Sequence, residues 1–581
     1  MVVWPNEAAH VVSRLWQFDK PRARIAPDRS RFAALAALDG ASRSSWGWWL
    51  AAATIAGLAA IPLITVALSA PDGGWRGLTQ LAPSVLGRYI GNTAALMVLS
   101  GALATLIGTG TAWLVSACAF PGRRTLGWAL VLPLAVPSYI AAYVYADLMD
   151  FSGPVQGALR AVTGWGVGDY AFPAIRSLWG GAVILALVLY PYIYLLARAA
   201  FATQSRAQFR AARSLGASPS RAFARVALPA ARPAIAGGLA LVLMEVLADF
   251  GVAEYFAIPT FSTGIFRSWL AMGDREAAMG LAALMLGFVA LLVALEGVTR
   301  KGRAEAGDGF ADHSDEPPLV NLSLAGKLGA LIACALPVTL GFVVPALHLA
   351  TLAMDEAAIR AASSLLSHAR ASVTLGLTVA VTTTALALIL AFAKSRSRGG
   401  ALTVMIRLAT LGYALPGALL AVGLLAPLGA FDQRVTGFAQ NQFGYAGGLL
   451  LTGTSLALVY ALCVRFLTVA YNALDGGMAR IPASLDAAAR SLGAGSARVL
   501  ARIYAPLLRP SLLAALALVL IDTLRELPAT LILRPFNLET LATRTYRLAS
   551  DERLVEASIP ALILLGVGLL PVMLLTRSRA R

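Results

Sequence analysis

Charged residues are scarce in this chain of 581 residues: Asp, Glu, Lys and Arg together make up only 13% of it. A soluble globular protein carries roughly 25% charged residues. The chain is instead 58% hydrophobic, and it holds many runs of the roughly 20 apolar residues that one helical membrane crossing needs. The strict alternation of polar and apolar residues that a membrane β-barrel requires is absent. The sequence therefore predicts an all-α polytopic membrane protein.

Cysteine and histidine are also rare. The three cysteines lie inside apolar runs and form no CxxC pair, which argues against a disulfide framework and against a zinc site. The four histidines are scattered without the spacing of metal ligands. The sequence contains no GxxxxGK[ST] segment, no nucleophile elbow and no HExxH motif. We therefore expect no catalytic residues, no resident metal, no cofactor and no ATP hydrolysis by this chain.

Basic residues outnumber acidic ones and give a net charge of +17. The interleaved basic and aromatic residues of a nucleic-acid groove are missing, so we do not expect nucleic acid as a partner. Lys and Arg instead gather in alternate polar loops, as they do on the cytoplasmic side of membrane proteins. This distribution predicts that both termini lie in the cytoplasm.

Twelve apolar runs predict about 12 transmembrane helices. They fall near residues 46–69, 92–119, 126–147, 178–199, 233–257, 277–298, 328–353, 371–393, 403–428, 447–471, 510–533 and 556–576. Residues 1–45 are polar and predict a cytoplasmic extension. Residues 299–327 are polar and contain Pro and Gly, which predicts a cytoplasmic linker between two halves, 46–298 and 328–581. Six spans in each half keep both halves in one orientation, related by a pseudo-twofold axis along the membrane normal.

One polar segment occurs twice, each time between two apolar runs. Ala211–Ala217 reads AARSLGA and recurs at Ala488–Ala494, and prolines follow at the same distance, at Pro229 and Pro506. Its Ala and Arg residues predict a short helix, Gly216 predicts a turn, and a second helix should follow that Pro229 ends. An amphipathic helix lying on lipid headgroups is the alternative. Because lipid does not demand a repeated sequence, we favour a docking element presented twice.

Acidic residues occur inside two predicted spans. Glu245 and Asp249 are four residues apart in the fifth span, and Asp522 and Glu526 repeat this spacing in the eleventh. Each pair is therefore expected on one helix face. Ionisable groups in a membrane are costly and usually face the bundle interior or a wet cavity. Since oxygen ligands suit hard cations, the four acids are candidates for lining a substrate path between the halves. Two structural interpretations stay open and carry the greater weight: pairing between helices, for instance with Arg525, and water access from the outer half of each span.

The repeated segment resembles the loop motif of binding-protein-dependent ABC importer permeases. Positions that match this motif are Ala211, Ala212, Gly216, Val226, Pro229, Ala488, Ala489, Gly493, Ile503 and Pro506. The resemblance implies that each loop forms a coupling helix that inserts into a cleft of an ATPase subunit. The family commonly begins the motif with Glu, whereas this chain has Arg210 and Ala487, with Asp486 one position early. No acidic contact with the ATPase is therefore assumed.

The resemblance covers most of residues 88–298 and 368–576, which implies two permease domains. Longer segments resemble the two halves of fused ferric-iron permeases: LADFG at 247–251, TFSTGIFR at 260–267, ELPATLILRPFN at 526–537 and TLATR at 540–544. The implied function is ATP-driven import of ferric iron across a bacterial inner membrane, by alternating access coupled through the two loops. The implied partners are two copies of an ABC ATPase, a periplasmic binding protein and membrane lipid.

Other interpretations stay open. Fused thiamine permeases share the two-half layout, and permeases for phosphonates and polyamines are more distant. A secondary carrier driven by an ion gradient also explains two six-span halves and buried acids, but it does not explain the repeated loop. A membrane enzyme or assembly scaffold would need a polar catalytic cluster at one membrane face, and the sequence offers none.

Overall fold

The computed structural model describes residues 41–69, 74–81, 85–203, 205–303, 320–396, 400–444 and 448–577. Nearly all of this part is helical, and its only strands are the two-residue β1 (Cys118–Ala119) and β2 (Val320–Asn321), which pair in parallel. The prediction of an all-α membrane protein is confirmed. Most of the predicted N-terminal extension, residues 1–40, and residues 304–319 of the predicted linker lie outside the described residues.

The predicted linker separates two series of helices. The first half contains, in chain order, α3 (Ala41–Ser69), α4 (Trp75–Leu81), α5 (Gly87–Ala117), α6 (Arg123–Ala129), η3 (Leu132–Ala135), α7 (Ser138–Met149), α8 (Pro154–Thr163), α9 (Leu178–Thr203), α10 (Ser205–Ser214), α11 (Pro219–Ala222), η4 (Phe223–Ala227), α12 (Leu228–Ala248), α13 (Gly251–Tyr255), α14 (Phe261–Phe266), η5 (Arg267–Ala271) and α15 (Arg275–Arg303). The second half contains α16 (Leu324–Val338), η7 (Thr339–Val343), α17 (Val344–Leu352), α18 (Glu356–Ala361), η8 (Ala362–Ser364), α19 (Leu365–Arg396), α20 (Gly400–Ala409), η9 (Thr410–Ala414), α21 (Gly417–Phe443), α22 (Ser455–Met478), α23 (Ala483–Ser491), α24 (Ser496–Val499), η10 (Leu500–Tyr504), α25 (Ala505–Leu507), α26 (Arg509–Arg525), α27 (Pro528–Leu533), α28 (Leu541–Ser550) and α29 (Leu554–Arg577).

Nine helices of the described part are long and apolar enough to cross a membrane, or eleven if two bent pairs each count as one span. Two further apolar helical stretches, Gly400–Ala414 and Leu554–Leu570, are shorter. The protein is therefore polytopic, as predicted, while the number of twelve spans and the pseudo-twofold axis stay predictions.

Two predicted spans are interrupted at a proline. Pro137 has an extended backbone (φ −59°, ψ 135°) and begins α7, and the helical segments on its two sides meet at 92°. Pro416 has the same backbone (φ −57°, ψ 142°) and begins α21. Proline lacks the N–H that a continuing helix needs and disfavours a helical residue before it. The spans predicted near 126–147 and 403–428 are therefore each divided at a proline into two helical segments.

The fifth and eleventh predicted spans also end early. Helix α12 stops at Ala248 and α26 stops at Arg525, and Asp249 and Glu526 follow with extended backbone (ψ 128° in both). The short helices α13 and α27 then continue the chain. The prediction that each pair of acids shares one helix face is therefore wrong, because the second acid of each pair lies beyond the helix.

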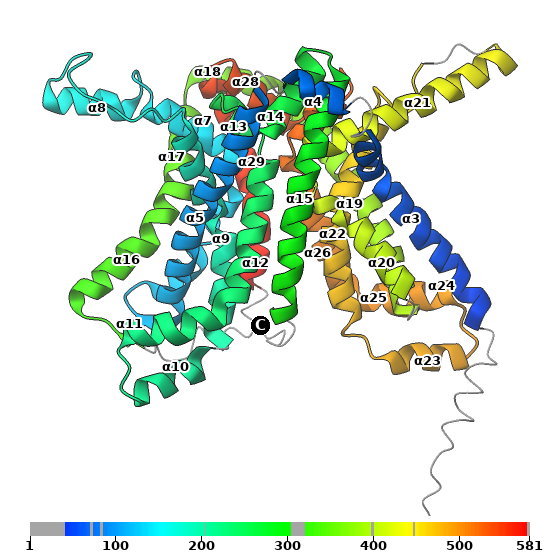
Figure 1. The fold of residues 1–581 in the computed structure, drawn as a ribbon, viewed down its shortest axis with the longest axis horizontal. Coiled ribbons are helices and arrows are strands. Elements are labelled where there is room, and N and C mark those ends of the chain that lie inside the picture. Colours follow the sequence, from blue (N-terminus) through cyan, green and yellow to red (C-terminus); the bar gives the residue numbers. More distant parts are fainter. Residues whose placement is uncertain are drawn as a thin grey trace, which may run out of the picture.

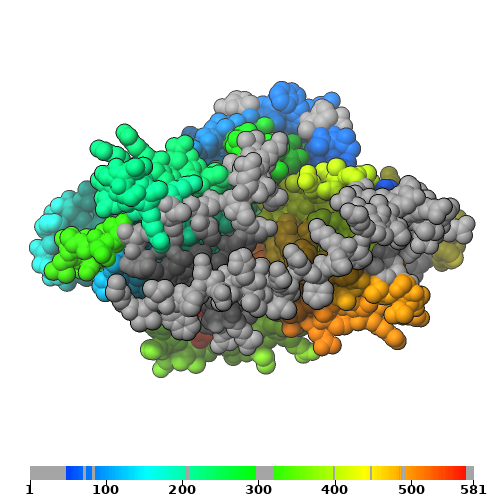
Figure 2. All heavy atoms as spheres, turned by 90° about the horizontal axis from the view of Figure 1, so that it is seen from below, coloured from blue at the N-terminus to red at the C-terminus, as the bar shows by residue number. Residues whose placement is uncertain are grey.

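The long helices form one bundle with two distinct ends (Figure 1). Helices α10, α11, α23 and α24 lie at the end that we call the loop end, and α13, α14, α18 and α28 lie at the opposite end, which we call the cap end. Helix α3 starts and α29 finishes at the loop end (Figure 1). Figure 2 looks onto the loop end and shows the two loop regions on opposite sides of that face.

The first helix of each half packs against the other half. Helix α3 contacts α19, α20 and α21, whereas α16 contacts α5 and α6, and α17 contacts α7. Two hydrogen bonds join the halves at these contacts. The hydroxyl of Tyr460 donates to the carbonyl of Leu58 at 2.6 Å, and the hydroxyl of Tyr145 donates to the carbonyl of Leu340 at 2.5 Å. The halves are therefore interlocked, and the domain boundaries drawn from the sequence stay predictions.

Candidate functional sites: two loop elements and a cavity between the halves

The repeated segment forms the same turn in both halves. Gly216 follows α10 with φ +85° and Gly493 follows α23 with φ +77°. In each copy the N–H after the glycine donates to the carbonyl of the motif's second alanine, at 3.1 and 3.0 Å. A side chain is strained at such a positive φ, which explains the glycine in both copies. We call residues 205–229 and 483–506 the loop elements.

A π-helical turn follows each glycine, η4 in the first half and η10 in the second. In the first half the helix then runs unbroken through Pro229 to Ala248, so the prediction that Pro229 ends a helix is wrong. The wider turn pairs the N–H of Leu228 with the carbonyl of Phe223, five residues back, and this shifted pairing accommodates the proline. In the second half the helix passes Pro506 and bends by 78° after α25.

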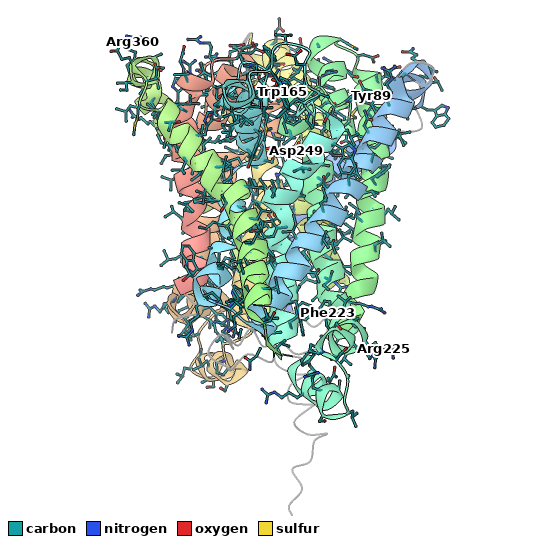
Figure 3. The ribbon with its side chains drawn as sticks, turned by 90° about the vertical axis from the view of Figure 1, so that its left-hand side faces the viewer. Tyr89, Trp165, Phe223, Arg225, Asp249 and Arg360 are labelled. Carbon is teal, nitrogen blue, oxygen red and sulfur yellow. The ribbon has the colours of Figure 1, made fainter. Side chains whose placement is uncertain are left out.

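Both loop elements present an apolar side chain beside the glycine. Leu215 and Leu492 are each 87% exposed, and a Cβ added at Gly216 or Gly493 meets no atom within 4 Å. The first loop element is held by Trp113, whose ring lies 4.7 Å from that of Phe223; Figure 3 places Phe223 and Arg225 at the loop end. The two loop elements therefore expose a leucine at the same position of the repeated segment, and the sequence analysis did not select these leucines as site residues.

A cavity of about 190 Å³ lies between the two halves. Its walls come from α7, α9, α12 and α13 on one side and from η9, α22, α26 and α27 on the other. Figure 3 shows Asp249, one of its wall residues, nearer the cap end than the loop end. The structure brings all four predicted path acids to this wall, namely Glu245, Asp249, Asp522 and Glu526. It adds residues that the sequence analysis did not select, among them Tyr139, Tyr192, Tyr413 and Arg465.

Two of the four acids cap the short helices that follow them. Asp249 accepts hydrogen bonds from the N–H groups three and four residues later, at 3.1 and 3.2 Å, and from the hydroxyl of Ser138 at 2.8 Å. Glu526 accepts from the equivalent N–H groups at 3.0 and 2.9 Å and from the hydroxyl of Thr530 at 2.7 Å. These bonds satisfy N–H groups at a helix start, so they explain why α12 and α26 end where they do.

Glu245 and Asp522 are the acids that remain. The hydroxyl of Tyr413 donates to Glu245 at 3.2 Å across the boundary between the halves. Asp522 lies within electrostatic reach of Glu245 and of two guanidinium groups, those of Arg525 and Arg465. In the part of the chain that the structure describes, no three His, Cys, Asp or Glu side chains are placed to hold a metal ion together. The four acids therefore do not form a carboxylate cage.

A buried apolar cluster covers the cavity on its cap side. Tyr139, Phe250 and Leu527 belong both to the cavity wall and to this cluster. Deeper in the cluster, Tyr143 is fully buried and stacks edge-on against Tyr255 at 4.4 Å. The cavity wall is therefore continuous with this buried cluster.

The comparison with known proteins identifies the family. Residues 119–298 match the model of the family described as "Binding-protein-dependent transport system inner membrane component". The molybdenum transport system permease protein ModB of Escherichia coli K12 is 30% identical over 205 residues, which are 34% of this chain and 86% of ModB. This chain belongs to that family. It is a multi-pass permease of the inner membrane, and its family implies a separate ATPase and a periplasmic binding protein as partners.

Two further relatives show how the permease compares along its length. The Fe(3+)-transport system permease protein FbpB 2 of Haemophilus influenzae is 25% identical over 526 residues, which are 89% of this chain and 95% of FbpB 2. The sulfate transport system permease protein CysW of Escherichia coli K12 is 28% identical over 216 residues, which are 36% of this chain and 71% of CysW. The permease is thus similar to a ferric permease over both halves and to a sulfate permease over about one.

Proposed function

We propose that this permease carries ferric iron in an ATP-driven importer that a periplasmic binding protein supplies. The observation that carries the proposal is the span of similarity. FbpB 2 matches 89% of the chain, whereas the molybdenum and sulfate relatives match 34% and 36% of it. Similarity along both halves therefore favours the cargo of the ferric permease. Similarity along one half gives weaker support to the cargo of the molybdenum and sulfate permeases.

The loop elements are the proposed coupling sites, through Ala211, Ala212, Gly216, Val226 and Pro229 and through Ala488, Ala489, Gly493, Ile503 and Pro506. Two facts support this role: both elements lie at one end of the bundle, and they stand on opposite sides of its face (Figures 1 and 2). One ATPase copy would dock on each element. Because Arg210 and Ala487 replace the usual glutamate, the contact relies on the exposed leucines rather than on an ion pair.

The proposed orientation places the loop end in the cytoplasm and the cap end toward the binding protein. Helix α3 starts and α29 finishes at the loop end (Figure 1), which supports two cytoplasmic termini. The excess of Lys and Arg in the loops on that side supports the same orientation. ATP-driven closure of the two ATPase copies would then move the loop elements and open the cavity alternately to the two sides.

An oxyanion is the second candidate cargo, because molybdenum and sulfate permeases are relatives and Arg465 and Arg525 line the cavity. The charges of the wall favour a cation, since four carboxylates face these two guanidinium groups. Thiamine, phosphonates and polyamines are the further alternatives, and transport driven by an ion gradient is the alternative mechanism.

Reconstitution tests cargo and energy source together. The permease, its ATPase and its binding protein are placed in proteoliposomes, and uptake of ferric iron, molybdate, sulfate and thiamine is measured with and without ATP. We expect uptake of iron alone, and only with ATP. Uptake of another solute instead of iron would refute the proposed cargo. Uptake driven by an ion gradient without the ATPase would refute the proposed ATP-driven mechanism.

A further inference from the structure

We propose that Tyr192 and Tyr413, together with Glu245 and Asp522, form a transient oxygen-ligand site for Fe3+ inside the cavity. The proposal rests on the proposed ferric function and deepens it, because it names the groups that hold the ion during passage. It also narrows the predicted path from four acids to two, since Asp249 and Glu526 are committed to capping helices.

The four side chains come from both halves and meet in one place. Tyr192 lies on α9 and Tyr413 on η9, and each lies within electrostatic reach of the other. Tyr413 also donates to Glu245 at 3.2 Å. Tyr192 lies within electrostatic reach of both Glu245 and Asp522. Since all four line the same cavity, phenol and carboxylate oxygens converge where the halves meet.

One tyrosine of the cavity wall has a buried hydroxyl without a hydrogen-bond partner in the described part of the chain. Tyr139 lines the cavity and is only 5% exposed. Among the residues that the structure describes, its hydroxyl has no hydrogen-bond partner. That hydroxyl lies within electrostatic reach of Arg525 and Glu526, which line the same wall. Buried polar groups in native proteins are almost always hydrogen-bonded, so Tyr139 is an exception in the wall of this cavity.

The oxygen set suits ferric iron. Hard cations prefer anionic oxygen ligands, and tyrosine is an established iron ligand in proteins. On binding, each phenol releases its proton to solvent and forms an Fe–O bond, and the ion stays ferric, so no electron donor is needed. The nearby Arg465 and Arg525 offset part of the negative charge of two phenolates and two carboxylates. Weakening the site in this way favours release, which a transit site requires.

The repeat explains why one such site exists rather than two. Tyr192 corresponds to Val469 when the halves are aligned on the repeated segment, Ala211 with Ala488. Tyr413 corresponds to Leu134 when they are aligned on the prolines that begin α7 and α21, Pro137 with Pro416. Neither the Val469 nor the Leu134 side chain can coordinate a metal, so the phenol pair occurs once. A single site on the boundary is the arrangement expected for one ion that passes between two halves.

The test removes only the hydroxyls. Tyr192→Phe, Tyr413→Phe and the double variant are compared with Tyr190→Phe, a matched control on the same helix. Tyr190 is fully buried, does not line the cavity, and has a hydroxyl without a partner in the described part of the chain. Two quantities are measured: ATP-driven uptake of ferric iron by proteoliposomes, and the visible phenolate-to-iron absorption when ferric citrate is added to the purified permease in nanodiscs.

We expect the wild type and Tyr190→Phe to show both the absorption and the uptake. The double variant should lose the absorption, and its uptake should fall by at least about tenfold, the lower range for disturbing a metal site. If the double variant does not fold, Tyr192→Phe alone decides, because it leaves the bond from Tyr413 to Glu245 intact.

The outcomes separate this inference from the proposed function. Wild-type iron uptake with an unchanged double variant would overturn the tyrosine site and leave the ferric function standing. A wild type that imports a different solute and no iron would overturn the ferric function and the site with it.

Discussion

The two halves of the permease agree at the loop end and differ around the cavity. At the loop end they share one segment, glycines at φ +85° and +77°, leucines with the same 87% exposure, and a π turn. Around the cavity, Arg465 and Arg525 of the second half correspond to Val188 and Ala248 of the first. This difference fits the proposed function, in which the matching surfaces would serve two ATPase copies and a single ion would need only one set of ligands.

In the cavity wall, a difference between the halves at one position is compensated by a second difference at a neighbouring position. In the first half Ser138 donates to the shorter Asp249 at 2.8 Å. At the matching positions the second half has Gly417 beside the longer Glu526, and a Cβ on Gly417 would lie 2.6 Å from a carboxylate oxygen of Glu526. Both halves thus have a helix break that is capped by an acidic side chain, but they use different pairs of residues. In each pair, the size of one side chain limits the size of the other.

The largest effect is expected from the loop glycines. The double change Gly216→Asp with Gly493→Asp should abolish ATP-driven uptake, because a charged side chain then occupies the docking surface of both loop elements. The left-handed backbone costs each substitution roughly 1–2 kcal/mol, so the protein should stay in the membrane. Uptake and the amount of permease in the membrane are both measured.

The matched control carries the same strain away from the loop end. Gly164 and Gly444 also have positive φ, +72° and +63°, and open space around a built Cβ. Gly164→Asp with Gly444→Asp should retain uptake. Equal loss of uptake in both double variants would show that backbone strain, and not docking, is responsible, and normal uptake in the first would refute the coupling role.

A smaller effect is expected from filling the space at Gly417. Gly417→Ala places a Cβ against Glu526 and against the guanidinium of Arg465, 2.9 Å away, and such overpacking costs about 1–3 kcal/mol. Ser138→Ala at the matching position loses one hydrogen bond and should cost about 1 kcal/mol. Thermal unfolding of the two purified variants compares the costs. A larger loss of stability in Ser138→Ala would contradict the compensation.

The effects confined to one ATPase contact each are expected from the exposed leucines. Leu215→Ser and Leu492→Ser each remove an apolar contact worth about 1.5–3 kcal/mol when it is buried by a partner, without disturbing the fold. Each should weaken ATPase binding by roughly tenfold or more, and by a similar factor, because the partners are identical. Titration of the ATPase onto the permease measures both affinities. A clear effect in one half alone would break the proposed equivalence of the loop elements.

The sequence predicted well what depends on hydropathy and repetition. Long apolar runs predicted the helices, and the repeated segment predicted both glycine turns. It also predicted that Glu245, Asp249, Asp522 and Glu526 face a shared interior, because ionisable side chains in a membrane usually face the bundle interior or a water-filled cavity. These features follow from local composition, so no knowledge of neighbouring helices was needed to find them.

Other features depend on contacts that the sequence does not display. A spacing of four suggests one helix face, but Asp249 and Glu526 instead bond to backbone N–H groups further along, and such side chains compete with helix continuation. Hydropathy places α3 in the membrane without revealing that it packs on the second half. Tyr192 and Tyr413 resemble ordinary aromatic residues of apolar runs, and only the fold brings both to the wall of one cavity.

The most direct test of the account counts ATPase copies on the permease by native mass spectrometry of the purified complex. The account predicts two copies on the wild type, one on either Gly216→Asp or Gly493→Asp alone, and none on the double variant. A wild type that binds a single copy, or single variants that both keep two, would contradict the claim that the loop elements are two equivalent docking sites.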